Sequence, residues 1–294
     1  MALPKTDFPA IRACIFDMDG LLINTEDIIT TSTNLILQKY NRPPLTPSVR
    51  AQLTGIPNST NGDTFHAWAQ LPIPRSQYAL EQSTETYRTF PTCKPMPGAA
   101  ALLQNLGLAR SVSTGEMIEL ALASSTKRAT FELKTQREEI RGLLGAFGEE
   151  RRVLGDDGRV KKGRGKPAPD VYLAALGAIN DSLSATSGPS TEKEEEEKQE
   201  RKPIMPNECL VFEDSIVGVE AGRRAGMRVV WVPHVDLVDE YRGMWEQILA
   251  GRTGMVRIVD GDEGQVGEVG DGWAESLESL EGFDYEKYGI EIPS

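Results

Sequence analysis

The sequence is poor in cysteine and histidine, the residue types on which disulfide scaffolds and many catalytic centres depend. Its 294 residues include three cysteines, Cys14, Cys93 and Cys209, which cannot all pair, so a disulfide framework is excluded. Cys14 and Cys209 lie within apolar runs and are expected to be buried free thiols, which favours a reducing, cytoplasmic setting. The two histidines, His66 and His234, are expected to be structural or surface residues.

An excess of basic charge and long apolar segments are also missing. The net charge of −12 provides no continuous basic surface to replace the counterions of a nucleic acid, so nucleic-acid binding is excluded. No run approaches the roughly 18 consecutive apolar residues that a membrane helix needs, and the first ten residues lack the apolar core of a signal peptide. We therefore expect a soluble globular protein in which a local cluster of donors or a metal attracts any anionic substrate.

Five short apolar runs have the character of strands that are buried on both faces of a parallel sheet. Such strands form continuous apolar runs because helices cover both of their faces. Most of the runs precede a helix-like stretch, an order typical of a doubly wound parallel α/β sheet with its ligand at the carboxyl ends of the strands. The runs are Ala13–Phe16, Glu119–Ala123, Arg152–Leu154, Cys209–Phe212 and Val229–Val232.

The stretch between the first two runs is far longer than a βα crossover requires. It contains apolar residues at helical spacing from Ile28 to Tyr40, and further helix-like stretches at 59–70 and 76–87. This pattern predicts an α-helical cap inserted into the sheet domain. We assign residues 22–96 to the cap domain, and residues 1–21 and 97–294 to the α/β core domain.

Two segments of the core domain have the composition of surface loops. Residues 182–202 contain few apolar side chains and a run of four glutamates, and are expected to form a disordered acidic loop. Residues 251–272 are rich in glycine and acidic residues, and are expected to form long surface loops.

Two carboxylates follow the first predicted strand. In an extended chain, positions i and i+2 point to the same side, so Asp17 and Asp19 can reach one small site, while Gly20 allows a sharp turn. Two carboxylates at this distance repel each other and would repel a phosphate. A bound Mg²⁺ would neutralise the charge and hold a phosphate oxygen against a nucleophile.

Other strand ends carry polar residues that suit the same site. Glu213 and Asp214 follow a later strand, as expected if several strand ends converge on one metal. Ser124 and Ser125 end another strand with hydroxyls that could bind a phosphate oxygen. Lys166 precedes a helix-like run and could supply a positive charge to the phosphate. Each feature alone has a structural explanation, but the combination in chain order favours a shared site.

These motifs closely resemble those of the haloacid dehalogenase (HAD) superfamily. The matching residues are Asp17-Met18-Asp19-Gly20, Ser124, Lys166 and Glu213-Asp214-Ser215. The resemblance covers most of the chain, and looser blocks such as IFDMDGLLINTED, TKRATFELKT and GKPAPDVYLAA are most similar to the pseudouridine 5′-phosphatase-like branch. It implies a Rossmann-like core with a cap domain, and a Mg²⁺-dependent phosphatase that acts on a small phosphorylated metabolite.

The resemblance also implies a role for each matched residue. Asp17 would attack phosphorus and become phosphorylated, and Asp19 would protonate the leaving alcohol and then activate water. Asp17, the backbone carbonyl of Asp19 and Asp214 would bind Mg²⁺, with Glu213 helping directly or through water. The phosphoryl oxygens would be held by Ser124, Ser125 and Lys166.

Differences from the superfamily patterns separate the alternatives. The presence of Asp19 argues against a dehalogenase. Phosphomutases of similar build carry a histidine twelve residues after the nucleophile, where this chain has Ile29, so a phosphatase is favoured over a sugar phosphomutase. A non-catalytic binding protein would lack the nucleophile or a metal ligand, and both are present here.

The sequence leaves the substrate open. Pseudouridine 5′-phosphate is the lead candidate by resemblance, followed by 2-deoxyglucose 6-phosphate, glycerol 3-phosphate and polyol phosphates. In capped relatives, a loop on the inner face of the cap contacts the substrate, and Gly55 and Ile56 are the counterparts here. Lys127 follows the hydroxyl cluster and is either a substrate contact or an exposed helix residue. Nothing in the sequence requires more than a monomer.

Overall fold

A computed structural model describes residues 7–54, 58–185, 202–254 and 267–293, except for the side chains of residues 58–61. Its centre is a six-stranded, wholly parallel sheet with the strand order β4-β3-β1-β5-β6-β7. The strands are β1 (Ala13–Phe16), β3 (Glu119–Ala123), β4 (Arg152–Val153), β5 (Cys209–Glu213), β6 (Arg228–Trp231) and β7 (Ala274–Ser276). A small antiparallel pair is formed by β2 (Arg110–Ser111) and β8 (Ile290–Glu291).

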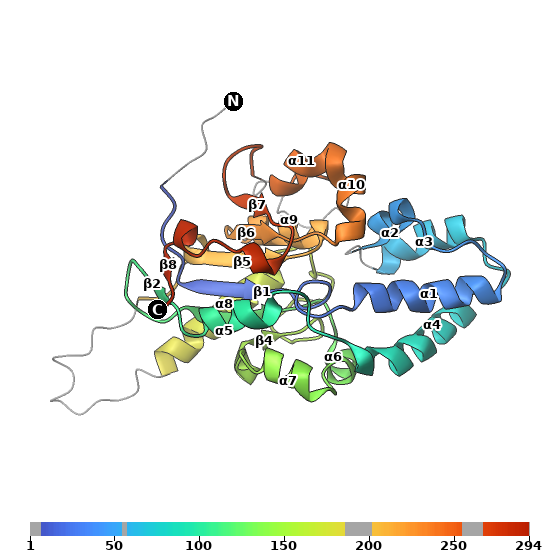
Figure 1. Ribbon diagram of the computed structural model, residues 1–294, viewed down its shortest axis with the longest axis horizontal. Coiled ribbons are helices and arrows are strands. Elements are labelled where there is room, and N and C mark those ends of the chain that lie inside the picture. Colours follow the sequence, from blue (N-terminus) through green and yellow to red (C-terminus); the bar gives the residue numbers. More distant parts are fainter. Residues whose placement is uncertain (1–6, 55–57, 186–201, 255–266, 294) are drawn as a thin grey trace.

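Hydrophobic side chains cover both faces of the sheet. Successive residues of a strand point to opposite faces, so Cys14 and Phe16 enter one apolar cluster while Ala13 and Ile15 enter the other. The first cluster includes helices α5 (Ala99–Leu106), α6 (Arg128–Lys134) and α7 (Glu138–Leu144). The second includes α8 (Asp170–Ala185), α9 (Ile216–Arg224) and α11 (Trp245–Leu249). Helices therefore cover both faces, which confirms the predicted doubly wound α/β core (Figure 1).

Four helices between β1 and α5 form a separate unit beside the sheet (Figure 1). They are α1 (Glu26–Lys39), α2 (Pro47–Leu53), α3 (Asn58–Ala69) and α4 (Arg75–Thr89), and are called the helical unit below. Thr46 caps α2 by accepting a hydrogen bond from the amide of Val49, and Pro47 occupies the first turn, where no amide donor is needed. The unit has its own apolar cluster, centred on Leu37, Phe65 and Tyr78.

The two chain segments that connect the helical unit to the core are paired with each other. The Asn24 amide donates to the Lys94 carbonyl and the Met96 amide donates to the Leu22 carbonyl, both at 2.9 Å. The two connecting segments therefore run side by side and are hydrogen-bonded to each other where the unit joins the core.

The remaining described elements are short. They are α10 (Val238–Tyr241) and the 3₁₀ turns η1 (Phe90–Thr92), η2 (Glu149–Arg151), η3 (Pro206–Glu208), η4 (Val235–Leu237), η5 (Arg242–Met244), η7 (Leu280–Gly282) and η8 (Glu286–Tyr288). None of the helices in the described ranges is long and apolar enough to cross a membrane.

One predicted loop boundary is wrong. Helix α8 continues to Ala185, so residues 182–185 are helical and do not belong to the acidic loop. Leu183 is the reason, because its side chain is buried in the apolar cluster on this face of the sheet and extends the helix by one turn. Residues 186–201 lie outside the described residues, as does most of the predicted loop region at 251–272.

Candidate active site

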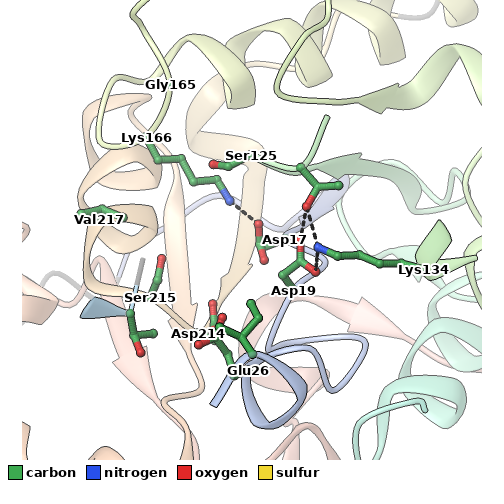
Figure 2. Close-up of a pocket in the computed structure, with 13 residues that line it drawn as sticks. Asp17, Asp19, Glu26, Ser125, Lys134, Gly165, Lys166, Asp214, Ser215 and Val217 are labelled. Carbon is green, nitrogen blue, oxygen red and sulfur yellow. Dashed lines mark hydrogen bonds and ion pairs between the residues drawn. The ribbon is translucent and has the colours of Figure 1, made fainter. Parts of the chain in front are cut away.

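The carboxyl ends of β1, β3 and β5 converge on a cavity of about 430 Å³. Figure 2 shows side chains from both the core and the first helix of the helical unit around it. The cavity is lined by Asp17, Asp19, Glu26, Ile29, Thr54, Ser125, Thr126, Lys134, Gly165, Lys166, Asp214, Ser215 and Val217.

Asp17 lies at the end of β1 and is 6% exposed. Its amide donates to the Phe212 carbonyl at 3.0 Å, which fixes the end of β1 against β5. Its carboxylate accepts a hydrogen bond from the ammonium group of Lys166. Burial raises the pKa of Asp17 to about 7, although the positive charge of Lys166 opposes that rise. A buried carboxylate that faces a cation is suited to nucleophilic attack on a phosphate.

Glu213, at the end of β5, holds Lys166 in place. Its side chain is fully buried and accepts hydrogen bonds from Lys166 Nζ at 2.5 Å and Tyr172 Oη at 2.6 Å. The second oxygen accepts from the Ser215 hydroxyl at 3.0 Å and from the amides of Asp214 and Ser215, both at 3.1 Å. Both oxygens of Glu213 are therefore used within the protein, and the residue lies behind the cavity lining.

The carboxylate of Asp214 differs from those of Asp17 and Glu213 in its contacts. Its carboxyl is buried, and within the described part of the chain no donor contacts it. Burial, together with the charges of Glu213 and Asp17, raises the pKa of Asp214 well above its usual range. One carboxylate oxygen from each of the three residues lies within 4.8 Å of the others, and Lys166 is the only ammonium paired with this described cluster. The uncompensated negative charge and the oxygen ligands fit a divalent cation.

Gly20 allows Asp214 to approach the turn after β1. Its φ of +79° is in the left-handed region, and a Cβ at this position would lie 2.1 Å from Asp214 Oδ2. A larger residue would therefore displace the carboxylate.

Asp19 has separate partners. Lys134 Nζ donates to Oδ1 at 2.6 Å, and the Thr126 hydroxyl donates to Oδ2 (Figure 2). Burial opposes ionisation of Asp19, but the Lys134 ammonium and the hydrogen bonds outweigh it and lower the pKa of the carboxyl. Lys134 and Thr126 thus hold the Asp19 side chain on the side away from the Lys166 cluster.

The structure places five of the ten residues predicted for the site around one cavity. The side chains of Asp17, Asp19, Ser125, Lys166 and Asp214 line one cavity. Other predicted residues lie elsewhere. Ser124 is fully buried, and its hydroxyl accepts from the Thr126 amide at 3.1 Å. Lys127 is exposed at the start of α6, outside the described lining, and Gly55 and Ile56 lie outside the described residues.

The sequence analysis missed several residues that line the cavity, among them the polar residues Thr126, Lys134 and Glu26. A signal for Lys134 exists, because it lies three residues after Phe131 and therefore on the buried face of α6. A lysine on an apolar helix face requires a buried partner. Glu26 lies in the first turn of α1, where acidic residues are common, so its position gives no comparable signal.

Comparisons with known proteins place the chain in a family. The family model described as haloacid dehalogenase-like hydrolase matches residues 11–226. A Saccharomyces cerevisiae protein named probable pseudouridine-5′-phosphatase is 34% identical over 96% of this chain and 98% of its own length. An Arabidopsis thaliana protein named (DL)-glycerol-3-phosphatase 1, mitochondrial, is 33% identical over 82% of this chain and 70% of its own length.

The fold also has solved counterparts. A crystal structure of a HAD hydrolase of family IA, variant 3, from Entamoeba histolytica has a TM-score of 0.59 and 18% sequence identity. It covers 95% of this chain and 98% of the other. The similarity extends over the core and the helical unit, and at this identity it concerns the fold alone.

Proposed function

Because this chain belongs to the haloacid dehalogenase-like hydrolases, we propose that it is a Mg²⁺-dependent phosphatase of small phosphate monoesters. One observation carries the proposal. Asp17, the buried residue at the end of β1, shares a cavity with the cation of Lys166 and with two further aspartates, Asp19 and Asp214.

In the proposed reaction, an oxygen of Asp17 attacks the phosphorus atom. The bond between phosphorus and the ester oxygen breaks, and the leaving oxygen receives a proton from Asp19. Water then attacks the aspartyl-phosphate and gives a proton to Asp19, inorganic phosphate leaves, and Asp17 regains its carboxylate. Lys166 and the Ser125 hydroxyl hold the phosphoryl oxygens through both steps. Ser124, buried below them, supports the turn through its bond to the Thr126 amide.

The metal would be held by Asp17, Asp214 and the backbone carbonyl of Asp19. When bound, Mg²⁺ neutralises the negative charge of the carboxylates and of the phosphate. Glu213 would contribute its charge from behind, because its oxygens already accept hydrogen bonds from Lys166, Tyr172 and Ser215.

We also propose that the chain between residues 22 and 96 acts as a cap over the site, with residues 1–21 and 97–294 forming the core. The support is that Glu26, Ile29 and Thr54 of this segment line the same cavity as Asp17. Closure of such a cap would exclude bulk water from the reacting phosphate. Gly55 and Ile56 stay predicted substrate contacts, because they follow Thr54 directly.

The lead substrate is pseudouridine 5′-phosphate. The support is the similarity to the yeast protein named for that activity, together with a cavity whose volume is in the range of about 300–1,000 Å³ usual for small-molecule sites. Glycerol 3-phosphate is the second candidate, supported by the plant relative. A phosphomutase is disfavoured, because Ile29, an apolar residue of the cavity lining, occupies the position of the mutase histidine.

The proposal also includes the cellular compartment and the oligomeric state of the protein. The three cysteines are buried free thiols, and burial raises the pKa of Cys93 to about 11. Inert thiols of this kind favour a reducing cytoplasmic compartment, and we propose that the enzyme acts there as a monomer.

Release of inorganic phosphate from a panel of phosphate monoesters, with and without Mg²⁺, tests the function. We expect turnover of pseudouridine 5′-phosphate that requires Mg²⁺ and is lost on chelation. The Asp17→Asn variant, which keeps the shape of the side chain but lacks the nucleophilic charge, should lose activity by several orders of magnitude.

Two results would contradict the proposal. Turnover by Asp17→Asn at the wild-type rate would exclude the aspartyl-phosphate. Isomerisation of a sugar phosphate without phosphate release would establish the mutase instead.

A further inference from the structure

Lys134 and Thr126 form a closed set of hydrogen bonds with Asp19. Lys134 Nζ lies 2.6 Å from Asp19 Oδ1 and 2.9 Å from Thr126 Oγ1, and Thr126 donates its hydroxyl to Asp19 Oδ2. Figure 2 shows Lys134 approaching Asp19 at one side of the cavity, while Lys166 approaches Asp17 from another side. Each catalytic carboxylate is therefore paired with its own lysine.

The burial of Lys134 makes this contact specific. The residue is 4% exposed, and its ammonium group lies 4.7 Å from the centre of the Phe90 ring. Transfer of an ammonium group from water into the protein is costly unless a counter-charge accepts it. Asp19 supplies that charge across 115 positions of sequence, so the two residues fix each other.

Asp17 and Asp19 also need to be kept apart. The two carboxylates are only two residues apart in the chain, yet the reaction requires one of them to remain free of phosphorus. Contacts to both oxygens of Asp19 direct it away from Asp17.

We propose that Lys134 is a positioning residue that holds Asp19 for the hydrolysis of the phosphoenzyme. The inference rests on the proposed function. In this step, the oxygen of water forms a bond to phosphorus and the bond between phosphorus and the Asp17 oxygen breaks. A proton of the water passes to the Asp19 carboxylate, and the products are inorganic phosphate and free Asp17. Lys134 touches neither the water nor the phosphate, and acts by fixing the carboxylate that receives the proton.

The two half-reactions separate this role from a structural one. With p-nitrophenyl phosphate, the leaving group departs without a proton, so formation of the phosphoenzyme makes little demand on Asp19. Hydrolysis of the phosphoenzyme still depends on Asp19. Loss of Lys134 should therefore slow only the second step.

The test compares Lys134→Met with Lys39→Met in rapid-mixing experiments with p-nitrophenyl phosphate and Mg²⁺. Lys39 is also paired with a carboxylate, that of Glu81, but it is largely exposed on the helical unit. We expect Lys134→Met to give a burst of about one nitrophenolate per enzyme, followed by turnover reduced about 10²-fold, the scale expected for a misplaced catalytic group. Lys39→Met should match wild type.

A purely structural role for Lys134 would lower the size of the burst, because fewer molecules would be folded. That result, or unchanged turnover in an active enzyme, would overturn the inference. If Lys134→Met does not fold, Thr126→Val replaces it in the same assay, since it removes the hydroxyl that contacts Asp19 Oδ2. Absence of the burst in that variant would also overturn the inference.

The wild type distinguishes this inference from the proposed function. A wild type that releases no phosphate from any ester of the panel defeats the proposed function, and the inference with it. If the wild type is active and Lys134→Met turns over at the same rate, only the inference is defeated.

Discussion

At the scale of single residues, the site depends on Glu213, a carboxylate with no contact with solvent. Burial alone would lower the pKa of Lys166, but the charges of Asp17 and Glu213 outweigh it and raise that pKa. Glu213 is fixed in turn by Tyr172 and Ser215. In the described contacts it holds the lysine against Asp17, which a motif match alone does not reveal.

The Glu213→Gln variant tests this anchoring function. It keeps the size of the side chain but removes the charge. It also places the donor group of the glutamine amide against groups that themselves donate, such as the Ser215 hydroxyl and backbone amide. Because Lys166 retains Asp17 as a partner, we expect a loss of about 3 kcal/mol in the free energy of unfolding, the low end for breaking a buried ion pair. Urea denaturation measures it.

Glu240→Gln is the matched control, because Glu240 is exposed on α10. Its free energy of unfolding should stay within about 0.5 kcal/mol of wild type. Equal stability of the two variants would show that Glu213 does not anchor the site.

At the scale of elements, the first turn of α9 packs directly over Glu213. A Cβ at Gly218 would lie 1.8 Å from the Glu213 carboxyl carbon, and the Gly218 amide donates to the side chain of Ser215, the N-cap residue. We expect Gly218→Ala to lower the free energy of unfolding by about 1–3 kcal/mol, because the helix or the carboxylate must shift.

Gly177 in α8 provides the comparison. A Cβ at this position meets no atom within 4 Å, so Gly177→Ala should raise stability by about 0.5–1 kcal/mol through the higher helix propensity of alanine. Thermal unfolding of both variants measures the contrast. We expect the stability to fall in Gly218→Ala and to rise in Gly177→Ala. A loss of similar size in both variants would show that replacing a glycine is itself destabilising, whatever the space over Glu213.

Elements differed in how far the sequence predicted them. Strands β1 and β3 have the predicted bounds, because a strand buried on both faces is a continuous apolar run with abrupt ends. Strand β7 (Ala274–Ser276) is half-buried at the edge of the sheet and has no such run, and β2 and β8 are two residues each. Their formation depends on pairing with distant chain, so local sequence carries no signal for them.

The same distinction applies to the site. Asp17, Lys166 and Asp214 were predictable because each follows a recognisable strand or precedes a helix. The contact between Lys134 and Asp19 joins residues 115 positions apart, and depends on how α6 packs against the turn after β1. Sequence pattern identifies the buried face of α6, but not the group that this face meets.

At the scale of the whole molecule, a group of charged residues joins the helical unit to the core beside the cavity. Arg50 of α2 donates to Asp27 of α1 at 2.9 Å and to Asp236 of η4 at 3.3 Å. His234, which precedes η4, lies 3.1 Å from Asp27 through Nε2. The Nδ1 atom of His234 accepts from the Asp236 amide at 3.2 Å. A ring that accepts at Nδ1 and faces a carboxylate at Nε2 is neutral, with its proton on Nε2.

Stability should therefore fall in mild acid through His234. Burial and the Arg50 charge lower the pKa of His234 below its ordinary value of 6.5, and outweigh the opposing effect of Asp27 and Asp236. The native state then binds fewer protons at this site than the unfolded state. Its contribution is fully present above pH 6.5, decreases as the pH falls below 6.5, and levels off below the native pKa.

Urea denaturation at pH 7.5 and pH 5.5, for wild type and His234→Gln, isolates this contribution. Other groups titrate in the same range, including Asp17 with its pKa of about 7, but they are common to both proteins and cancel in the comparison. We expect the loss of stability between the two pH values to be larger in wild type than in His234→Gln. Equal losses would show that His234 is not held neutral between the helical unit and the core. A larger loss in the variant would mean that protonated His234 pairs with Asp27 and strengthens the contact, which reverses the predicted sign.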